Sequence, residues 1–143
     1  MKIETKPLLT VLIGFSLGTA GFTKALPAAR RQIARGNYLV NQVAKCGDCH
    51  SPHNARGQVP PGHKLAGGRL DFQPAHPVPG WTAVTPSLRG LPTVTLHQAM
   101  QLLTRAKDKT GKPPAPPMPE YHMKRADAAA IIAYLKSLPP EGK

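Results

Sequence analysis

The pattern of hydrophobic and polar positions predicts three helices separated by long loops. In residues 27–45, apolar or small side chains recur three or four positions apart, as on one face of a helix, and the arginines lie largely off that face. A second helix is expected to begin at Thr95, because Thr95 and Gln98 have capping-box spacing, and to end at Gly111. The same periodicity predicts a third helix over residues 125–138. The apolar face of the second helix would consist of Leu96, Ala99, Met100 and Leu103.

The segments between these helices lack a regular pattern. Prolines and glycines interrupt residues 51–80 at short intervals, and residues 112–119 form a stiff proline loop. No run of alternating or β-branched residues indicates a strand. The sequence therefore predicts an all-α, loop-rich fold.

The composition limits how large a core the chain can build for itself. Its 143 residues suffice for one small domain, yet only 5% are aromatic, while proline (17) and glycine (13) are abundant. A long loop such as residues 51–80 is uncommon in a compact domain unless it serves a function. A buried apolar cofactor would supply both a body to fold around and an edge for the loop to cover.

The two cysteines of the chain supply the strongest chemical signal. Cys46 and Cys49 are two residues apart, and His50 follows directly. A Cys-x-x-Cys-His run is the attachment site of a c-type haem. The two thiols bond to the haem vinyl groups, and the imidazole reaches the iron from one face. The motif therefore predicts one covalent haem c.

Three other uses of a cysteine pair fit this sequence less well. A structural zinc site needs four ligands, and the chain has neither a second cysteine pair nor a histidine pair at finger spacing. A thioredoxin-type dithiol would need a βαβ pattern around the motif. A disulfide that closes so short a loop would stabilise little. Covalent haem is the favoured interpretation.

A methionine in the proline loop is the favoured second iron ligand. Met118 lies between Pro117 and Pro119, and proline restricts both its own φ angle and the residue before it. A weak thioether–iron bond requires such a loop with few conformations. Met123, a histidine or an open site are the alternatives, and Met100 is expected to pack in the core. The remaining histidines are expected at the surface: His53, His63, His76, His97 and His122.

The N-terminus has the pattern of a targeting segment. Residues 1–25 begin with two lysines, continue with an uncharged, mostly apolar run over residues 8–22, and end in small residues. The run is short for a membrane span, which needs about 20 residues, so cleavage is favoured over an uncleaved anchor. Either outcome places the folded domain, residues 26–143, in the periplasm or another extracytoplasmic space.

The chain is strongly basic, with a formal charge of +12. Removing residues 1–25 takes away three lysines and one glutamate and leaves 16 basic and 6 acidic residues, a charge of +10. Such an excess steers a protein toward acidic partners. Nucleic acid is not the expected partner, because no helix-turn-helix, zinc-finger or aromatic-interleaved basic pattern is present. A membrane would be contacted only if the N-terminal segment stays attached.

Several motifs together resemble those of class I cytochromes c. The chain is most similar to the monohaem domains in cytochrome subunits of membrane-bound alcohol and aldehyde dehydrogenases. The likeness extends over residues 30–140. The matching segments are residues 34–40, 46–52, 65–68, 116–119 and 132–139.

This resemblance implies how the pocket is built. The first and last helices would cross beside the haem and bring Gly36 near Tyr134 and Leu135. A proline carbonyl beyond the motif would orient His50 by accepting from its second ring nitrogen, and Pro60 or Pro61 occupies the matching position.

The resemblance implies that Trp81 and Arg69 contact the haem propionates.

The resemblance also implies the function. With His50 and Met118 bound, the iron would pass one electron at a time through the haem edge, so the chain is expected to be a carrier and not an enzyme. A haem enzyme or sensor with an open or labile sixth iron position is the alternative. The expected partners are redox proteins with acidic docking surfaces, among them a dehydrogenase or a terminal oxidase.

Overall fold

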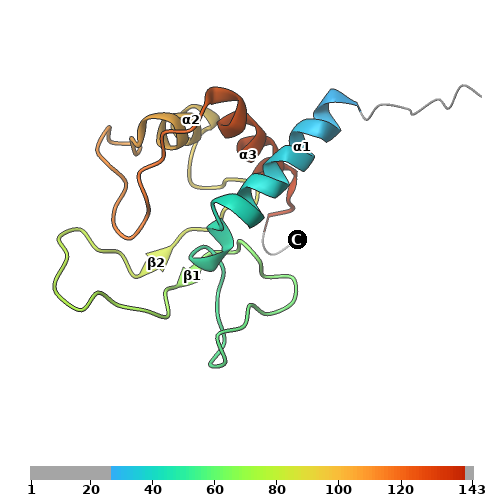
Figure 1. The fold of residues 1–143 in the computed structure, drawn as a ribbon. Helices are drawn as coiled ribbons and strands as arrows, with labels where there is room; N and C mark the ends of the chain where they lie inside the picture. The colour runs from blue at the N-terminus through green and yellow to red at the C-terminus, as the bar shows by residue number, and fades with distance from the viewer. Residues whose placement is uncertain (1–26, 141–143) are drawn as a thin grey trace, which may run out of the picture.

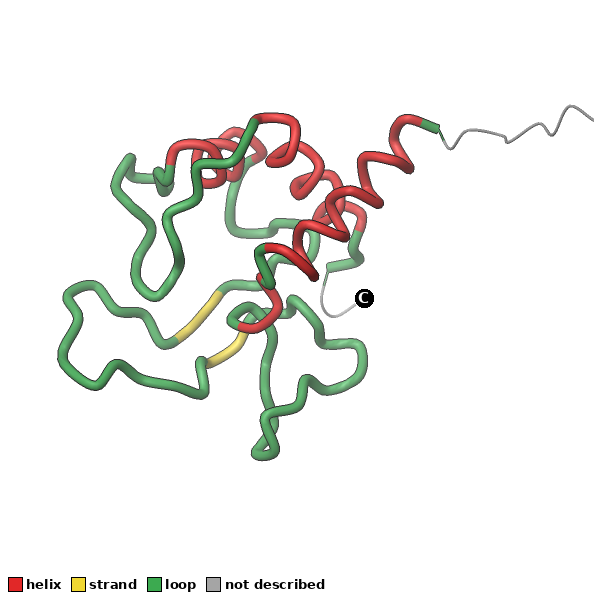
Figure 2. Tube along the Cα trace, viewed as in Figure 1, coloured by secondary structure: helices red, strands yellow, loops and turns green. Residues whose placement is uncertain are grey.

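A computed structural model describes residues 27–140, and the expected segment 1–25 lies outside this range. The described chain is mostly helix and loop, which confirms the all-α prediction (Figure 1). Most of the loop between the first two helices lies on one side of the helical part (Figure 2). The regular elements are α1 (Ala28–Tyr38), a π-helical turn (Leu39–Val43), a 3-10 turn (Cys46–Asp48), β1 (Gly68–Arg69), β2 (Val84–Thr85), α2 (Leu96–Arg105) and α3 (Arg125–Ser137).

Helices α1 and α3 cross in close contact, as Figure 1 shows. The crossing point is Gly36, which is buried. A Cβ atom placed there would overlap the carbonyl oxygen of Ala130 and would lie 2.7 Å from Cβ of Tyr134. Gly36 therefore lies against Tyr134, as the resemblance implied, and the backbone of Ala130 is closer still. Only a residue without a side chain lets the two backbones approach this closely.

The first helix ends earlier than predicted and changes its geometry before it ends. After Tyr38 the chain makes a π-helical turn, in which the Ala44 amide donates to the Leu39 carbonyl at 2.8 Å. Lys45 then adopts a left-handed conformation with φ 48°. This reversal ends the helix and directs the chain into the cysteine motif.

Helix α2 begins where the sequence predicts and ends sooner. The Thr95 side chain accepts from the Gln98 amide at 3.2 Å, and the Gln98 side chain accepts from the Thr95 amide at 2.9 Å, so the capping box is confirmed. The helix stops before Ala106, which is left-handed with φ 49°, and the expected end at Gly111 is wrong. Of the predicted apolar face, Ala99 and Leu103 are buried and Met100 is partly buried, whereas Leu96 is 57% exposed.

Helix α3 agrees with its predicted range to within one residue, and it supplies much of the core. Its buried positions pack with Leu39, Val40, Leu65 and Leu91. Within residues 27–140, no helix is long and apolar enough to cross a membrane. The buried residues of α3 are Ala128, Ala130, Ile131, Ile132 and Leu135.

Candidate functional site

A cavity of about 520 Å³ lies among α2, α3, the cysteine motif and the loops before and after α2. Cys46, Cys49, His50 and Met118 all line it, so the structure brings the four predicted site residues to one place. Its volume is within the range of roughly 300–1,000 Å³ typical of ligand and cofactor sites. The leucines and isoleucines of its wall are Leu88, Leu91, Leu102, Leu103, Ile131, Ile132 and Leu135.

The imidazole of His50 is held in one orientation. Its Nδ1 lies 2.9 Å from the carbonyl oxygen of Pro86, which can only accept, so Nδ1 carries the hydrogen. Nε2 is then the nitrogen with a free lone pair, as a metal ligand requires. Burial lowers the pKa of His50, which favours the same neutral form.

The partner of His50 differs from the one that the resemblance implied. Pro60 and Pro61 do not receive this hydrogen bond; the Pro60 carbonyl instead accepts from the His63 amide at 3.1 Å in a local turn. Pro86 is 36 residues beyond His50, and nothing in the local sequence marks it. Only the folding of the long loop decides which proline carbonyl reaches the ring.

A short antiparallel ladder brings Pro86 to the haem motif. Gly68 of β1 pairs with Thr85 of β2, and the Thr85 hydroxyl donates to the Cys49 carbonyl at 2.8 Å. The Gly67 amide donates to the His50 carbonyl at 2.8 Å. Gly67 has φ 76°, and an added Cβ would lie 2.7 Å from the Thr85 carbonyl oxygen, so the chain at Gly67 passes residues 85–87 at a distance that excludes a side chain. The ladder thus fixes Cys49, which precedes His50 in the chain, and Pro86, whose carbonyl accepts from the His50 ring.

Burial raises the pKa of both thiols of the motif. Burial is the main reason that the pKa of Cys46 is raised to about 11, with smaller effects from nearby charges. Burial raises the pKa of Cys49 as well, followed by the negative charge of Asp48. Both cysteines are free in the structure and lie in the cavity wall, where they can reach the same bound group.

The loop that carries Met118 is held at several points. The Thr82 amide donates to the Pro116 carbonyl at 2.9 Å, and the Met118 amide donates to the Ala115 carbonyl at 3.1 Å. Among the methionines of residues 27–140, Met118 alone lines the cavity. Met123 is partly buried against the core, and its amide donates to the Leu103 carbonyl of α2, so it belongs to the core packing.

Of three polar side chains considered for the site, only Tyr121 lines the cavity; Trp81 and Arg69 do not, although Trp81 directly precedes the lining residue Thr82. Tyr121 lines the cavity, and burial raises the pKa of its phenol. The indole Nε1 of Trp81 is buried and has no hydrogen-bond partner among the described residues. Arg69, the other implied propionate contact, is exposed. Tyr121 was not predicted as a site residue; its position three residues after Met118 is the signal that the sequence offers.

The comparisons with known proteins identify the class to which this fold and site belong. The family model of cytochrome c matches residues 33–139, which is most of the chain. The chain belongs to the cytochrome c family, whose members transfer electrons through a c-type haem. This membership supports a role in electron transfer, and the haem interpretation of the cysteine pair prevails over zinc and dithiol chemistry.

The chain is similar to particular cytochrome subunits of bacterial dehydrogenases. It is 32% identical to the cytochrome c subunit of a quinone alcohol dehydrogenase from Gluconobacter oxydans, over 78% of this chain and 25% of that protein. The corresponding subunit from Gluconacetobacter polyoxogenes is 33% identical over 88% and 28%. A fructose dehydrogenase cytochrome subunit from Gluconobacter japonicus is 29% identical over 76% and 22%. The chain therefore spans about a quarter of the length of these relatives.

Proposed function

We propose that residues 26–143 carry a single haem c, bound covalently through Cys46 and Cys49, with His50 and Met118 as its axial ligands. The observation that carries this proposal is the common cavity, which these four side chains reach from two segments far apart in the sequence. A His/Met pair raises the reduction potential relative to bis-histidine ligation. Such a site serves an electron carrier that accepts and passes on single electrons.

The surrounding residues fit this group. The bound haem supplies reversible one-electron chemistry at its iron. The Pro86 carbonyl keeps Nε2 of His50 available, and the aliphatic walls exclude water from the metal. The prolines around Met118 restrict where its sulfur can move. The unpartnered Nε1 of Trp81 suits an oxygen of a propionate.

We further propose that the carrier works outside the cytoplasmic membrane with an acidic redox partner. Residues 1–25 would direct export and then be removed or remain as an anchor through residues 8–22. Lys45 and Lys109 support the choice of partner, because both line the cavity and both are exposed. A quinone-dependent dehydrogenase is the favoured donor, since the similar proteins are cytochrome subunits of such enzymes, and a terminal oxidase is a candidate acceptor.

The axial ligand is tested by spectroscopy of matched methionine variants. The oxidised protein is expected to show a sulfur-to-iron charge-transfer band, which Met118→Ala removes and Met123→Ala leaves in place. The reverse pattern would assign the bond to Met123. A protein that lacks the band from the start, and that binds carbon monoxide rapidly when reduced, would instead be an enzyme or sensor with an open sixth position.

Haem number, processing and partner charge need separate measurements. The intact mass of the native protein reports one haem and the cleavage of residues 1–25 together, and haem staining on a denaturing gel reports covalent attachment. Electron transfer with the native partner is expected to slow as salt is added, because salt screens exposed charges. A rate that does not change with ionic strength would contradict electrostatic steering of this protein toward an acidic partner.

A further inference from the structure

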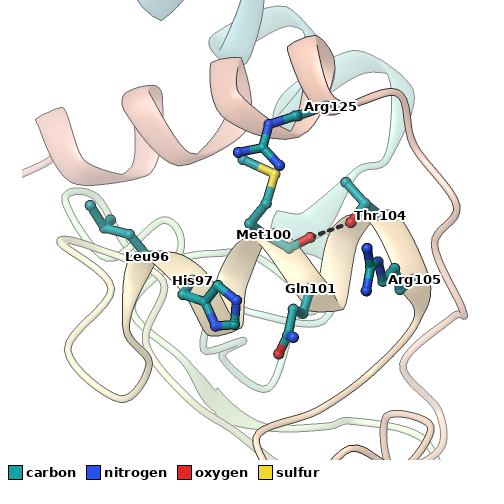
Figure 3. A pocket seen from close by; sticks show the side chains of 7 residues that line it. All are labelled: Leu96, His97, Met100, Gln101, Thr104, Arg105 and Arg125. Atoms are coloured by element: carbon teal, nitrogen blue, oxygen red, sulfur yellow. Dashed lines mark hydrogen bonds between the residues drawn. The ribbon is translucent and has the colours of Figure 1, made fainter.

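A second cavity, of about 380 Å³, lies on the outer side of α2, where that helix meets the beginning of α3. Figure 3 shows the side chain of Arg125 reaching from α3 toward Met100, while His97, Gln101 and Arg105 form a row along α2. No residue of the haem cavity is shared with it. Its lining residues are Leu96, His97, Met100, Gln101, Thr104, Arg105 and Arg125.

The two cavities lie against opposite faces of α2. Gln98, Ala99, Leu102 and Leu103 line the haem cavity, whereas the other positions from Leu96 to Arg105 line the outer one. With 3.6 residues per turn, the centres of these two sets are about 180° apart around the helix axis. A molecule bound at the outer cavity would therefore leave the haem side of the helix accessible.

The charges of the outer cavity are unbalanced. None of its lining residues is acidic, and two of them are arginines. Within residues 27–140, neither Arg105 nor Arg125 forms an ion pair, whereas Arg35 pairs with Asp127 at 3.0 Å. Two guanidinium groups beside one cavity repel each other, and a carboxylate between them would remove that repulsion and accept several hydrogen bonds.

The cavity also has an apolar part, which an inorganic anion would leave in contact with water. Leu96 is 57% exposed, although it is a large hydrophobic residue. Met100 is only partly buried and packs against the core from the cavity wall. Arginine and methionine are both enriched at protein interfaces, and methionine adapts its shape to different partners. The lining therefore matches a ligand that presents carboxylates next to aliphatic side chains.

We propose that the outer cavity between α2 and α3 docks an acidic, leucine-rich segment of a partner protein, separately from the haem opening. Arg105 and Arg125 would bind its carboxylates, and Leu96 with Met100 would contact its aliphatic side chains. A bilayer surface is the less suitable occupant, because the two guanidinium groups border a concave site. This contact would hold the carrier to its partner while the haem side exchanges electrons. It deepens the partner assignment but is independent of which side chains bind the iron.

The probe is a short synthetic peptide of glutamate and leucine, titrated into the reduced holoprotein. Amide chemical shifts are expected to change along the outer face of α2 and at Arg125, and not around Lys45 and Lys109. Replacing both arginines (Arg105→Gln with Arg125→Gln) should weaken binding about tenfold, the size expected for losing two exposed charge contacts. Leu96→Ser should weaken it less, whereas a peptide of glutamate and serine should bind poorly to every variant.

The matched control removes the same charge elsewhere. Arg30→Gln with Arg56→Gln deletes two exposed arginines outside the cavity, and this variant should bind the peptide like the unmodified protein. Equal weakening in both double variants, shift changes spread over the whole surface, or shifts confined to the haem opening would overturn the proposal. So would anionic vesicles that bind through Arg105 and Arg125 when the peptide does not.

Two additional measurements distinguish a failure of the docking site from a failure of the proposed haem ligation. Gln101→Glu places a carboxylate in the cavity without deleting either arginine, so it should also weaken peptide binding, and its haem spectrum should not change. Reduction by a small inorganic reductant should proceed equally in the Arg105→Gln, Arg125→Gln double variant. A failure of the proposed ligation would appear in that spectrum, whereas a failure of the docking site would appear only in the titration.

Discussion

Gly36→Ala is a sharp test of how α1 and α3 support the haem cavity. Helix propensity alone predicts that this change stabilises the protein by about 1 kcal/mol, because glycine is unfavourable inside a helix. The structure predicts the opposite sign. The new methyl group would overlap the carbonyl oxygen of Ala130 and lie 2.7 Å from Cβ of Tyr134. Neither neighbour is the free end of a flexible side chain, so the helices themselves must separate.

The expected magnitude follows from these two opposing effects. Overpacking a close contact costs about 1–3 kcal/mol, and a clash with backbone belongs at the upper end of that range. After subtracting the gain in helix propensity, a net loss of about 2 kcal/mol remains. At roughly 4 °C per kcal/mol for a domain of this size, the midpoint of thermal unfolding should fall by about 8 °C.

The assay is thermal unfolding of the oxidised holoprotein, followed by far-ultraviolet circular dichroism and by haem absorbance. The matched variant is Ala34→Gly, at an exposed position of the same helix, which should lower the midpoint by about 4 °C through propensity alone. If Gly36→Ala raised the midpoint, or left it unchanged, the close crossing of α1 and α3 would be refuted.

Three further predictions concern single hydrogen-bonding groups. Thr85→Val removes the hydroxyl that donates to the Cys49 carbonyl at 2.8 Å, so the free energy of unfolding in urea should fall by about 1–2 kcal/mol, whereas Thr85→Ser should retain most of it. Thr95→Ala removes the cap of α2 and should cost about 1 kcal/mol in the same assay. The pKa of Asp108 is lowered, chiefly by the hydrogen bond from the Thr110 side chain. Its contribution to stability is therefore present above the ordinary carboxyl pKa of about 3.9 and lost as the pH falls through the lowered value, so Asp108→Asn should flatten the acid limb of a stability–pH profile.

The helices were largely predictable because their signals are local. A capping box fixes the start of α2 at Thr95, and apolar periodicity with a following proline pair fixes α3. The helix ends were predictable only in part. Ala106 and Lys45 adopt left-handed conformations that neither residue type favours, so the surrounding packing, and not the local sequence, imposes these two stops.

The residues of the candidate site likewise divide into those that local sequence predicts and those that it does not. Cys46, Cys49 and His50 form a contiguous motif, and the prolines beside Met118 mark its loop, so these four residues are recognisable before any folding is known. Pro86 carries no such mark. It reaches His50 because β1 and β2 pair across a long loop, and two-residue strands are too short to leave a periodic pattern in the sequence.

The sequence by itself determined the chemistry of this protein: one covalent attachment motif, a restricted methionine and three amphipathic helices. These features depend on residue type and on spacings of a few residues, so they are present in the chain before it folds. The tertiary structure alone decided which carbonyl orients the His50 ring, how closely Gly36 lets α1 and α3 approach, and which face of α2 stays exposed beside Arg105 and Arg125. Each of these depends on contacts between distant segments, and such contacts exist only after the long loops have closed.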